Sequence, residues 1–261
     1  MKLDFTDSVY MLKKRTDDPE PLQKELSLYF ERFEFFEIEG VSKPVNAGTI
    51  ECSLYEILRH EKTDETAMDI TRNHLAMIQK AYQEGKQTAL FLEDDVHFEL
   101  REMETWRDRL LSWVHPSHHH VWDILYLGYC PFPLILSFWT APGFIRVFTP
   151  LTSHAYVLNR HGMEKILGYA STTEGKKPCH IDKMFTKIPS MRKYAVFPMM
   201  AFQKKDPALY LKACDHISTH ISFTTLCKTF EWLSLFFPIL FLFLLIWFVY
   251  RMIVYRFHRA M

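Results

Sequence analysis

The sequence has no excess of either charge, with 31 Lys and Arg residues against 31 Asp and Glu residues. A chain without a basic excess has little with which to neutralise phosphates, so this balance argues against a nucleic-acid partner. The length of 261 residues fits one globular domain of roughly 200 residues plus an appendage. A domain of that size buries most of its apolar surface and forms a real core.

Cysteine is scarce and widely spaced. The five cysteines are widely spaced and include no CxxC pair. An odd count at wide spacing argues against a disulfide framework or a structural zinc site, and favours free thiols in a reducing compartment. Two disulfide bonds with one remaining thiol stay open as an alternative.

The N-terminus lacks an apolar run of signal-peptide length, which argues against a cleaved secretory signal. The C-terminal part differs, because residues 232–250, WLSLFFPILFLFLLIWFVY, contain no charge. As a helix this run spans the ~30 Å hydrocarbon core of a bilayer. We therefore predict a linker at 223–231, a transmembrane helix at 232–250 and a basic tail at 251–261. A buried core helix is the alternative.

The membrane orientation is less clearly indicated. Arg251, Arg256 and Arg259 follow the predicted helix, and Lys212 and Lys228 precede it. The positive-inside rule therefore weakly favours a cytosolic tail. The missing signal sequence instead favours a cytosolic domain at 1–222. We predict a single-pass membrane protein with that domain in the cytoplasm.

Apolar clusters alternate with helical patterns along the domain, which is typical of an α/β fold. The residues from 131 to 150 predict a long loop or two short strands. Trp122–Leu127 predicts a strand closed by Gly128, and Ala195–Phe197 an outer strand. Further strands are expected at 8–12, 35–38, 89–92 and 155–158, and helices at 71–84, 99–114, 162–169, 181–185 and from Asp18–Pro19 onward.

Three carboxylates, Glu93, Asp94 and Asp95, directly follow the apolar run ending at Leu92. In open α/β sheets, ligands bind beyond the carboxyl ends of the strands. Hard oxygen ligands suit Mg²⁺ or Mn²⁺, and such an ion offsets negative charge on a departing diphosphate. Like charges placed together also favour a bound cation. A solvated acidic turn is the alternative.

Six segments in this order resemble glycosyltransferase family 25, the lipooligosaccharide and procollagen galactosyltransferase-like group. The resemblance covers roughly residues 8 to 200. The segments are VYMLKKRTDD at 9–18, RNHLAMIQKAY at 72–82, LFLEDDVHFE at 90–99, WDILYLG at 122–128, SHAYVLNRHGMEKIL at 153–167 and HIDKMF at 180–185.

The resemblance implies a GT-A-like, Rossmann-type domain that binds a nucleotide sugar. It implies transfer of a hexose, such as galactose, from a UDP-sugar to a glycan, glycolipid or protein acceptor, assisted by Mn²⁺ or Mg²⁺. Glu93 and Asp95 then form the metal- and nucleotide-binding motif, which Asp94 orients. His74 lies near the donor, although a hydrogen-bonded helix histidine is an equal alternative.

The resemblance also implies roles for residues outside the acidic motif. Lys14 and Arg15 would meet the donor diphosphate, and the alternative is an ordinary exposed basic pair. Asp182 would be the general base that takes the proton of the acceptor hydroxyl, or else a cap of its own helix. His154 would contact donor or acceptor, or pack beneath the site.

The sequence departs from the family pattern at four positions, Met11, Asp69, Ile70 and Asn73. These departures leave the carboxylates in place. They also leave open a second class of function, a non-catalytic membrane-anchored binding module. A metal-dependent phosphoryl-transfer enzyme is a third class. It leaves the WDILYLG and SHAYVL segments unexplained, and the chain has no P-loop.

Overall fold

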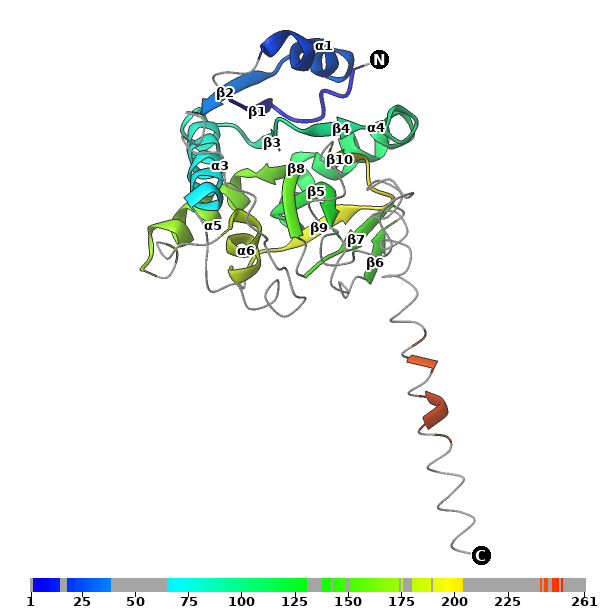
Figure 1. Cartoon of the computed structure of the whole chain (residues 1–261). Coiled ribbons are helices and arrows are strands. Elements are labelled where there is room, and N and C mark those ends of the chain that lie inside the picture. Colours follow the sequence, from blue (N-terminus) through cyan, green and yellow to red (C-terminus); the bar gives the residue numbers. More distant parts are fainter. Residues whose placement is uncertain are drawn as a thin grey trace, which may run out of the picture.

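The structure is a computed structural model, and most of the domain is described. The described residues are 2–14, 18–38, 65–130, 138–141, 143–148, 151–173, 175, 180–188, 190–203, 240, 242–243, 246–248 and 250. They form a mixed α/β fold around an eight-stranded sheet with the order β2-β1-β3-β8-β5-β9-β7-β6 (Figure 1). A separate two-stranded sheet pairs β10 with β4.

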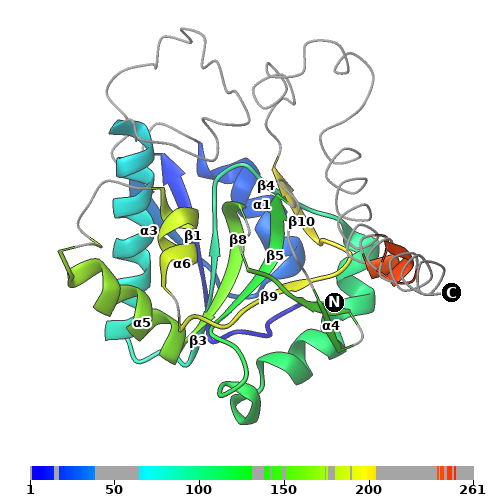
Figure 2. The same cartoon turned by 90° about the horizontal axis from the view of Figure 1, so that it is seen from below.

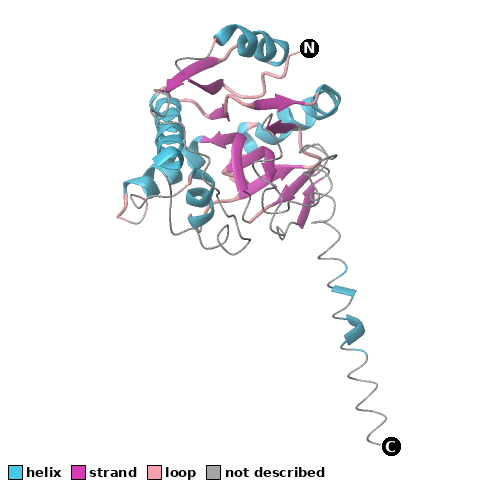
Figure 3. Ribbon diagram, in the orientation of Figure 1, coloured by secondary structure: helices cyan, strands magenta, loops and turns pink. Residues whose placement is uncertain are grey.

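The main sheet combines strands of both directions (Figure 3). Strand β1 runs parallel to β2 and β3, whereas β8 lies antiparallel between β3 and β5. Because β8 runs opposite to β3, the first half of β8 lies at the edge where β3 ends. The strands are β1 Ser8–Lys14, β2 Glu34–Ile38, β3 Thr88–Leu92, β4 Val96–Phe98, β5 Ile124–Cys130, β6 Phe138–Ala141, β7 Phe144–Arg146, β8 Leu151–Asn159, β9 Lys193–Val196 and β10 Ala201–Gln203.

The helices are α1 Pro19–Tyr29, α3 Glu65–Gln83, α4 Leu100–Val114, α5 Arg160–Ser171 and α6 Ile181–Lys187. Local chemistry fixes two of their starts. The Asp18 side chain accepts a hydrogen bond from the Glu20 amide, and Pro19 occupies the first turn. The Asn159 side chain likewise accepts from the Gly162 amide at the start of α5.

Alternating side chains of the central strands separate two apolar cores, one on each face of the sheet. One core contains Phe91 and packs against α3, α5 and α6, and the other contains Leu90 and packs against α1 and α4. Figure 2 shows α3, α5 and α6 on one side of the sheet and α4 on the other. The result is a three-layer arrangement.

Most predicted elements are confirmed, and three are corrected. Helix α3 begins at Glu65 rather than at Thr71. Strand β5 runs through Gly128 to Cys130 instead of stopping before it. The predicted outer strand, β9, is internal because β7 pairs with its second edge.

The predicted linker and tail lie outside the described residues, as does most of the 232–250 segment. Within the described part of the chain, no helix has the length and apolar character needed to cross a bilayer.

Candidate functional site

The predicted acidic motif forms the turn at the carboxyl end of β3. All five residues of β3 are buried, so the polar residues begin where the strand leaves the core. The Glu93 amide donates to the carbonyl oxygen of His154 (2.9 Å), and the Val96 amide donates to the Glu93 carbonyl (3.2 Å). The turn containing Glu93, Asp94 and Asp95 is thereby fixed to β8 on one side and to β4 on the other.

The Glu93 side chain turns toward α3 and β8. Its Oε1 atom accepts a hydrogen bond from the Ser153 hydroxyl (3.2 Å) and lies 3.3 Å from Nε2 of His74. His74 is fully buried, and its Nδ1 atom lies 2.8 Å from the Tyr156 hydroxyl oxygen. The three segments that the sequence analysis singled out at 72–82, 90–99 and 153–167 therefore meet at one carboxylate.

The partners of His74 define its hydrogen bonding. A carboxylate only accepts hydrogen bonds, so the Nε2 atom carries the proton toward Glu93. In the tautomer that carries its proton on Nε2, Nδ1 accepts from the Tyr156 hydroxyl. Burial and the negative charge of Glu93 raise the pKa of Tyr156 well above its usual value, which keeps this hydroxyl protonated as a donor. Two hydrogen bonds in series therefore run from Tyr156 to His74 and from His74 to Glu93.

Asp182 lies in the first turn of α6, on the same face of the sheet. Its Oδ1 atom accepts from the amide of the next residue, Lys183 (2.7 Å), whereas the N-cap position of α6 is His180. The Phe185 ring of α6 packs edge-on against Tyr156 with centroids 5.2 Å apart. Burial, with a contribution from the charge of Asp182, raises the pKa of Tyr126 well above its usual value. Asp182 therefore lies near Tyr126, whose ring neighbours Tyr156 of the hydrogen-bonded series at Glu93.

His154 has a structural contact in this fold. Its side chain is buried, and Nε2 lies 3.1 Å from the carbonyl oxygen of Ala201 in β10. This contact ties the small sheet to the main one and agrees with the packing alternative. Contact of His154 with a substrate stays a prediction.

The basic residues predicted to meet the donor are not described at the level of side chains. Lys14 ends β1, but its side chain and all of Arg15 lie outside the described residues. Their neighbour Lys13 is buried and forms an ion pair with Glu37 (3.4 Å).

The acidic turn has carboxylate oxygens that suit a cation, but it does not form a complete set of protein ligands. Among the residues that the structure describes, no three His, Cys, Asp or Glu side chains gather closely enough to hold a metal ion. Mg²⁺ usually binds through one or two carboxylates together with substrate phosphates and waters. Two carboxylates, Glu93 and Asp95, are the kind of donor set that such an open site needs.

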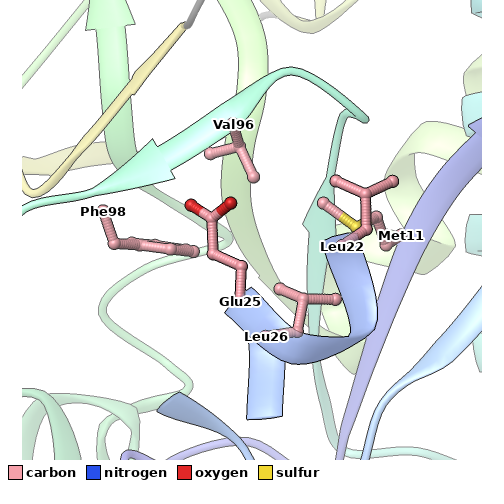
Figure 4. Close-up of a pocket in the computed structure, with 6 residues that line it drawn as sticks. All are labelled: Met11, Leu22, Glu25, Leu26, Val96 and Phe98. Carbon is pink, nitrogen blue, oxygen red and sulfur yellow. The ribbon is translucent and has the colours of Figure 1, made fainter. Parts of the chain in front are cut away.

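An apolar depression beside the acidic turn is too small for a nucleotide (Figure 4). Its space for a water-sized molecule is about 0 Å³, whereas ligand pockets usually begin at ~300 Å³. The Glu25 carboxylate points from α1 toward β4 at its rim. Met11, one of the departures from the family pattern, lines its wall. The other lining residues are Leu22, Leu26, Val96 and Phe98.

Sequence reasoning missed three residues of this site: Ser153, Tyr126 and Tyr156. All three lie inside predicted motifs, SHAYVL and WDILYLG. The available signal is a tyrosine in the middle of an otherwise apolar strand, because a buried hydroxyl needs a hydrogen-bond partner.

No protein-family model matches the sequence, and no curated protein is significantly similar to it. Among solved structures, the chain is similar to a glycosyltransferase involved in glycosylation of the major capsid of PBCV-1. The identity is 13% and the TM-score 0.38, over 72% of this chain and 81% of the other. It is also similar to mannose-1-phosphate geranyltransferase from Thermus thermophilus, with 11% identity and a TM-score of 0.43 over 75% of each chain. Structural similarity at this level does not indicate the activity of this chain.

Proposed function

We propose that this chain is a glycosyltransferase that moves a hexose from a UDP-sugar to a glycan, glycolipid or protein acceptor at a membrane. The observation that carries the proposal is the convergence at the end of β3. There Glu93 is held by His74 and Ser153, and Asp182 of α6 lies on the same face of the sheet. Distant motifs that resemble family 25 thus supply one candidate site.

In the proposed reaction, Asp182 accepts the proton of the acceptor hydroxyl. The acceptor oxygen forms a bond to the anomeric carbon of the sugar while the bond from that carbon to the diphosphate oxygen breaks. UDP leaves with the electron pair of the broken bond. The inverting course follows from a single carboxylate base opposite the leaving group.

Glu93 and Asp95 are the proposed holders of a divalent cation, Mn²⁺ or Mg²⁺. When bound, such a cation supplies Lewis-acid stabilisation of the diphosphate. His74 and Ser153 fix the rotation of the Glu93 carboxylate, and Asp94 orients the turn.

The membrane part of the proposal rests on the described residues between 240 and 250. All have helical backbone, and their side chains are 53–65% exposed. At about 100° per residue these positions point to every side of a helix, and an all-round apolar helix is typical of a membrane span rather than of a surface helix. The residues are Leu240, Leu242, Phe243, Ile246, Trp247, Phe248 and Tyr250.

The test is calorimetric titration of the full chain in detergent with UDP, with and without Mn²⁺. We expect Mn²⁺-dependent binding, weakened at least about tenfold in Asp95→Asn because a cation ligand is lost. Asp108→Asn, an exposed position on α4, is the matched control and should bind as the wild type does. A folded wild-type chain that binds no UDP would refute the proposal.

The apolar depression at Met11 favours one alternative, a non-catalytic binding module. Strand β1 presents a buried methionine where the family pattern has an asparagine. Under this alternative the chain binds UDP without turning over any UDP-sugar. Binding and turnover measured on the same preparation separate the two functions.

A further inference from the structure

Four aromatic side chains form a continuous row across the centre of the sheet. Tyr10 pairs with Phe91, Phe91 with Tyr156, and Tyr156 with Tyr126, each on the adjacent strand. The centroids of successive rings are 5.8, 5.3 and 6.5 Å apart. All four belong to the core beneath α3 and α6.

The three tyrosine hydroxyls of this row differ in their partners. The Tyr10 hydroxyl donates to Glu84 (2.7 Å), and that of Tyr156 lies 2.8 Å from Nδ1 of His74. The Tyr126 hydroxyl is buried, and within the described part of the chain it has no hydrogen-bond partner. Buried polar atoms are nearly always paired, so an unpaired hydroxyl at one end of this row indicates a hydrogen bond that forms in another state of the site.

Asp182 of α6 is the candidate partner of Tyr126. Ile181 and Phe185 of α6 lie in the same core cluster as Tyr126, and Asp182 stands between them in sequence. The charge of Asp182 also contributes to the raised pKa of Tyr126, so the hydroxyl stays protonated and is able to donate. Oδ1 of Asp182 already accepts from the Lys183 amide.

We propose that Tyr126 is a positioning residue for Asp182, its hydroxyl donating a hydrogen bond to the carboxylate once an acceptor is bound. This assignment rests on the proposed role of Asp182 as general base. This hydrogen bond fixes rotation of the carboxylate about its terminal torsion, which directs one oxygen toward the acceptor hydroxyl. Tyr126 itself touches no reacting atom.

The experiment compares Tyr126→Phe with the wild type in UDP release from a UDP-sugar and in thermal unfolding, using the full chain in detergent. We expect kcat to fall about ten- to a hundredfold, as for a lost hydrogen bond to a charged group, while the KM for the donor stays unchanged. The Tm should hold or rise, because the variant removes an unpaired buried hydroxyl. Tyr156→Phe is the comparison that should lower the Tm, since its hydroxyl has a partner.

Two further variants test the link to Asp182. Tyr29→Phe alters a buried tyrosine on the opposite face of the sheet and should leave kcat unchanged. Tyr126→Phe combined with Asp182→Asn should be no slower than Asp182→Asn alone, because the two residues act as a unit.

The possible outcomes separate this inference from the proposed function. An active wild type with an equally active Tyr126→Phe would overturn the role of Tyr126 and leave the function standing. A further tenfold loss in the double variant, or a Tm that falls as in Tyr156→Phe, would overturn it as well. A wild type that binds UDP but releases none from any UDP-sugar would overturn both.

Discussion

Gly128 and His154 are packed so closely that a Cβ atom on residue 128 would lie 2.1 Å from Nε2 of His154. It would also lie 2.2 Å from the carbonyl oxygen of Ala201. These are the two groups that join β8 to β10, 3.1 Å apart. Residue 128, the last of WDILYLG, is therefore a glycine because a side chain would collide with these two groups. It does not end the strand, which continues through it to Cys130.

We expect Gly128→Ala to lower the free energy of unfolding by about 1–3 kcal/mol, the usual cost of overpacking a filled core. The added methyl group would separate His154 from Ala201. Urea denaturation measures the effect. Gly168→Ala on α5 is the matched control, because a Cβ there meets nothing within 4 Å. Alanine in a helix should stabilise the chain by about 0.5–1 kcal/mol, and equal losses at both positions would contradict the packing argument.

His74→Leu should destabilise the chain by about 2 kcal/mol or more, because it leaves the buried Tyr156 hydroxyl without its partner and removes a donor from Glu93. UDP should also bind more weakly, since the Glu93 carboxylate loses one of the groups that orient it. Chemical denaturation and UDP titration give the two values. The exposed His120 is the control position, where alanine should change stability by no more than about 0.5 kcal/mol.

Local patterns were sufficient to predict most of the elements. The alternation of side chains in β3 and β8 and the Asp18–Pro19 start of α1 depend on neighbours in sequence. The internal position of β9 does not, because it depends on pairing with β7. Strand β4 was missed because only four residues separate the acidic turn from the first residue of α4, too few for a periodic pattern.

The candidate site was predictable in part. The sequence placed Glu93 at the end of a buried strand, which the structure confirms. The direction of its carboxylate depends on His74 and Ser153, at sequence separations of 19 and 60 residues, and no local pattern contains that information. The aromatic row through Tyr126 likewise exists only once β8 is inserted antiparallel between β3 and β5.

Asp123→Asn should strongly destabilise the chain at neutral pH. Asp123 is fully buried directly before β5, where Arg192 donates at 2.8 Å and Lys165 at 2.8 Å. Burial alone would raise the pKa of Asp123, but the hydrogen bonds from Arg192 and Lys165 outweigh it and hold that pKa well below its usual range. Removing one partner of such a buried cluster costs about 3–5 kcal/mol.

The pH dependence of this effect has a definite sign. A depressed native pKa gives stability that is complete above the unfolded value of about 3.9 and is lost as the pH falls below it. The difference in free energy of unfolding between the wild type and Asp123→Asn should therefore be constant from pH 7 to 5 and become smaller toward pH 3. Urea unfolding at these three pH values measures it, with Asp108→Asn as the exposed control. A difference that widens on acidification would contradict the assignment.

Lys193 provides the opposite case, a buried charge whose hydrogen-bond acceptors among the described residues are carbonyl oxygens. Its Nζ atom donates to those of Phe148 (3.1 Å) and Thr186 (3.5 Å), the latter in the last turn of α6. Burial lowers the pKa of Lys193 to about 8. Between that value and the unfolded value of about 10.4, the native chain binds fewer protons than the unfolded chain, so stability rises with pH through this window.

Lys193→Met keeps the apolar stem and removes the ammonium group, and with it this pH dependence. Relative to the wild type, the variant should be more stable at pH 7 than at pH 10.5, by about 3 kcal/mol. Urea unfolding at pH 7, 8.5 and 10.5 gives the difference. Lys24→Met, an exposed position on α1, should show a constant difference at all three values. A Lys193→Met difference that is also constant would mean that the amine is not desolvated in the native state.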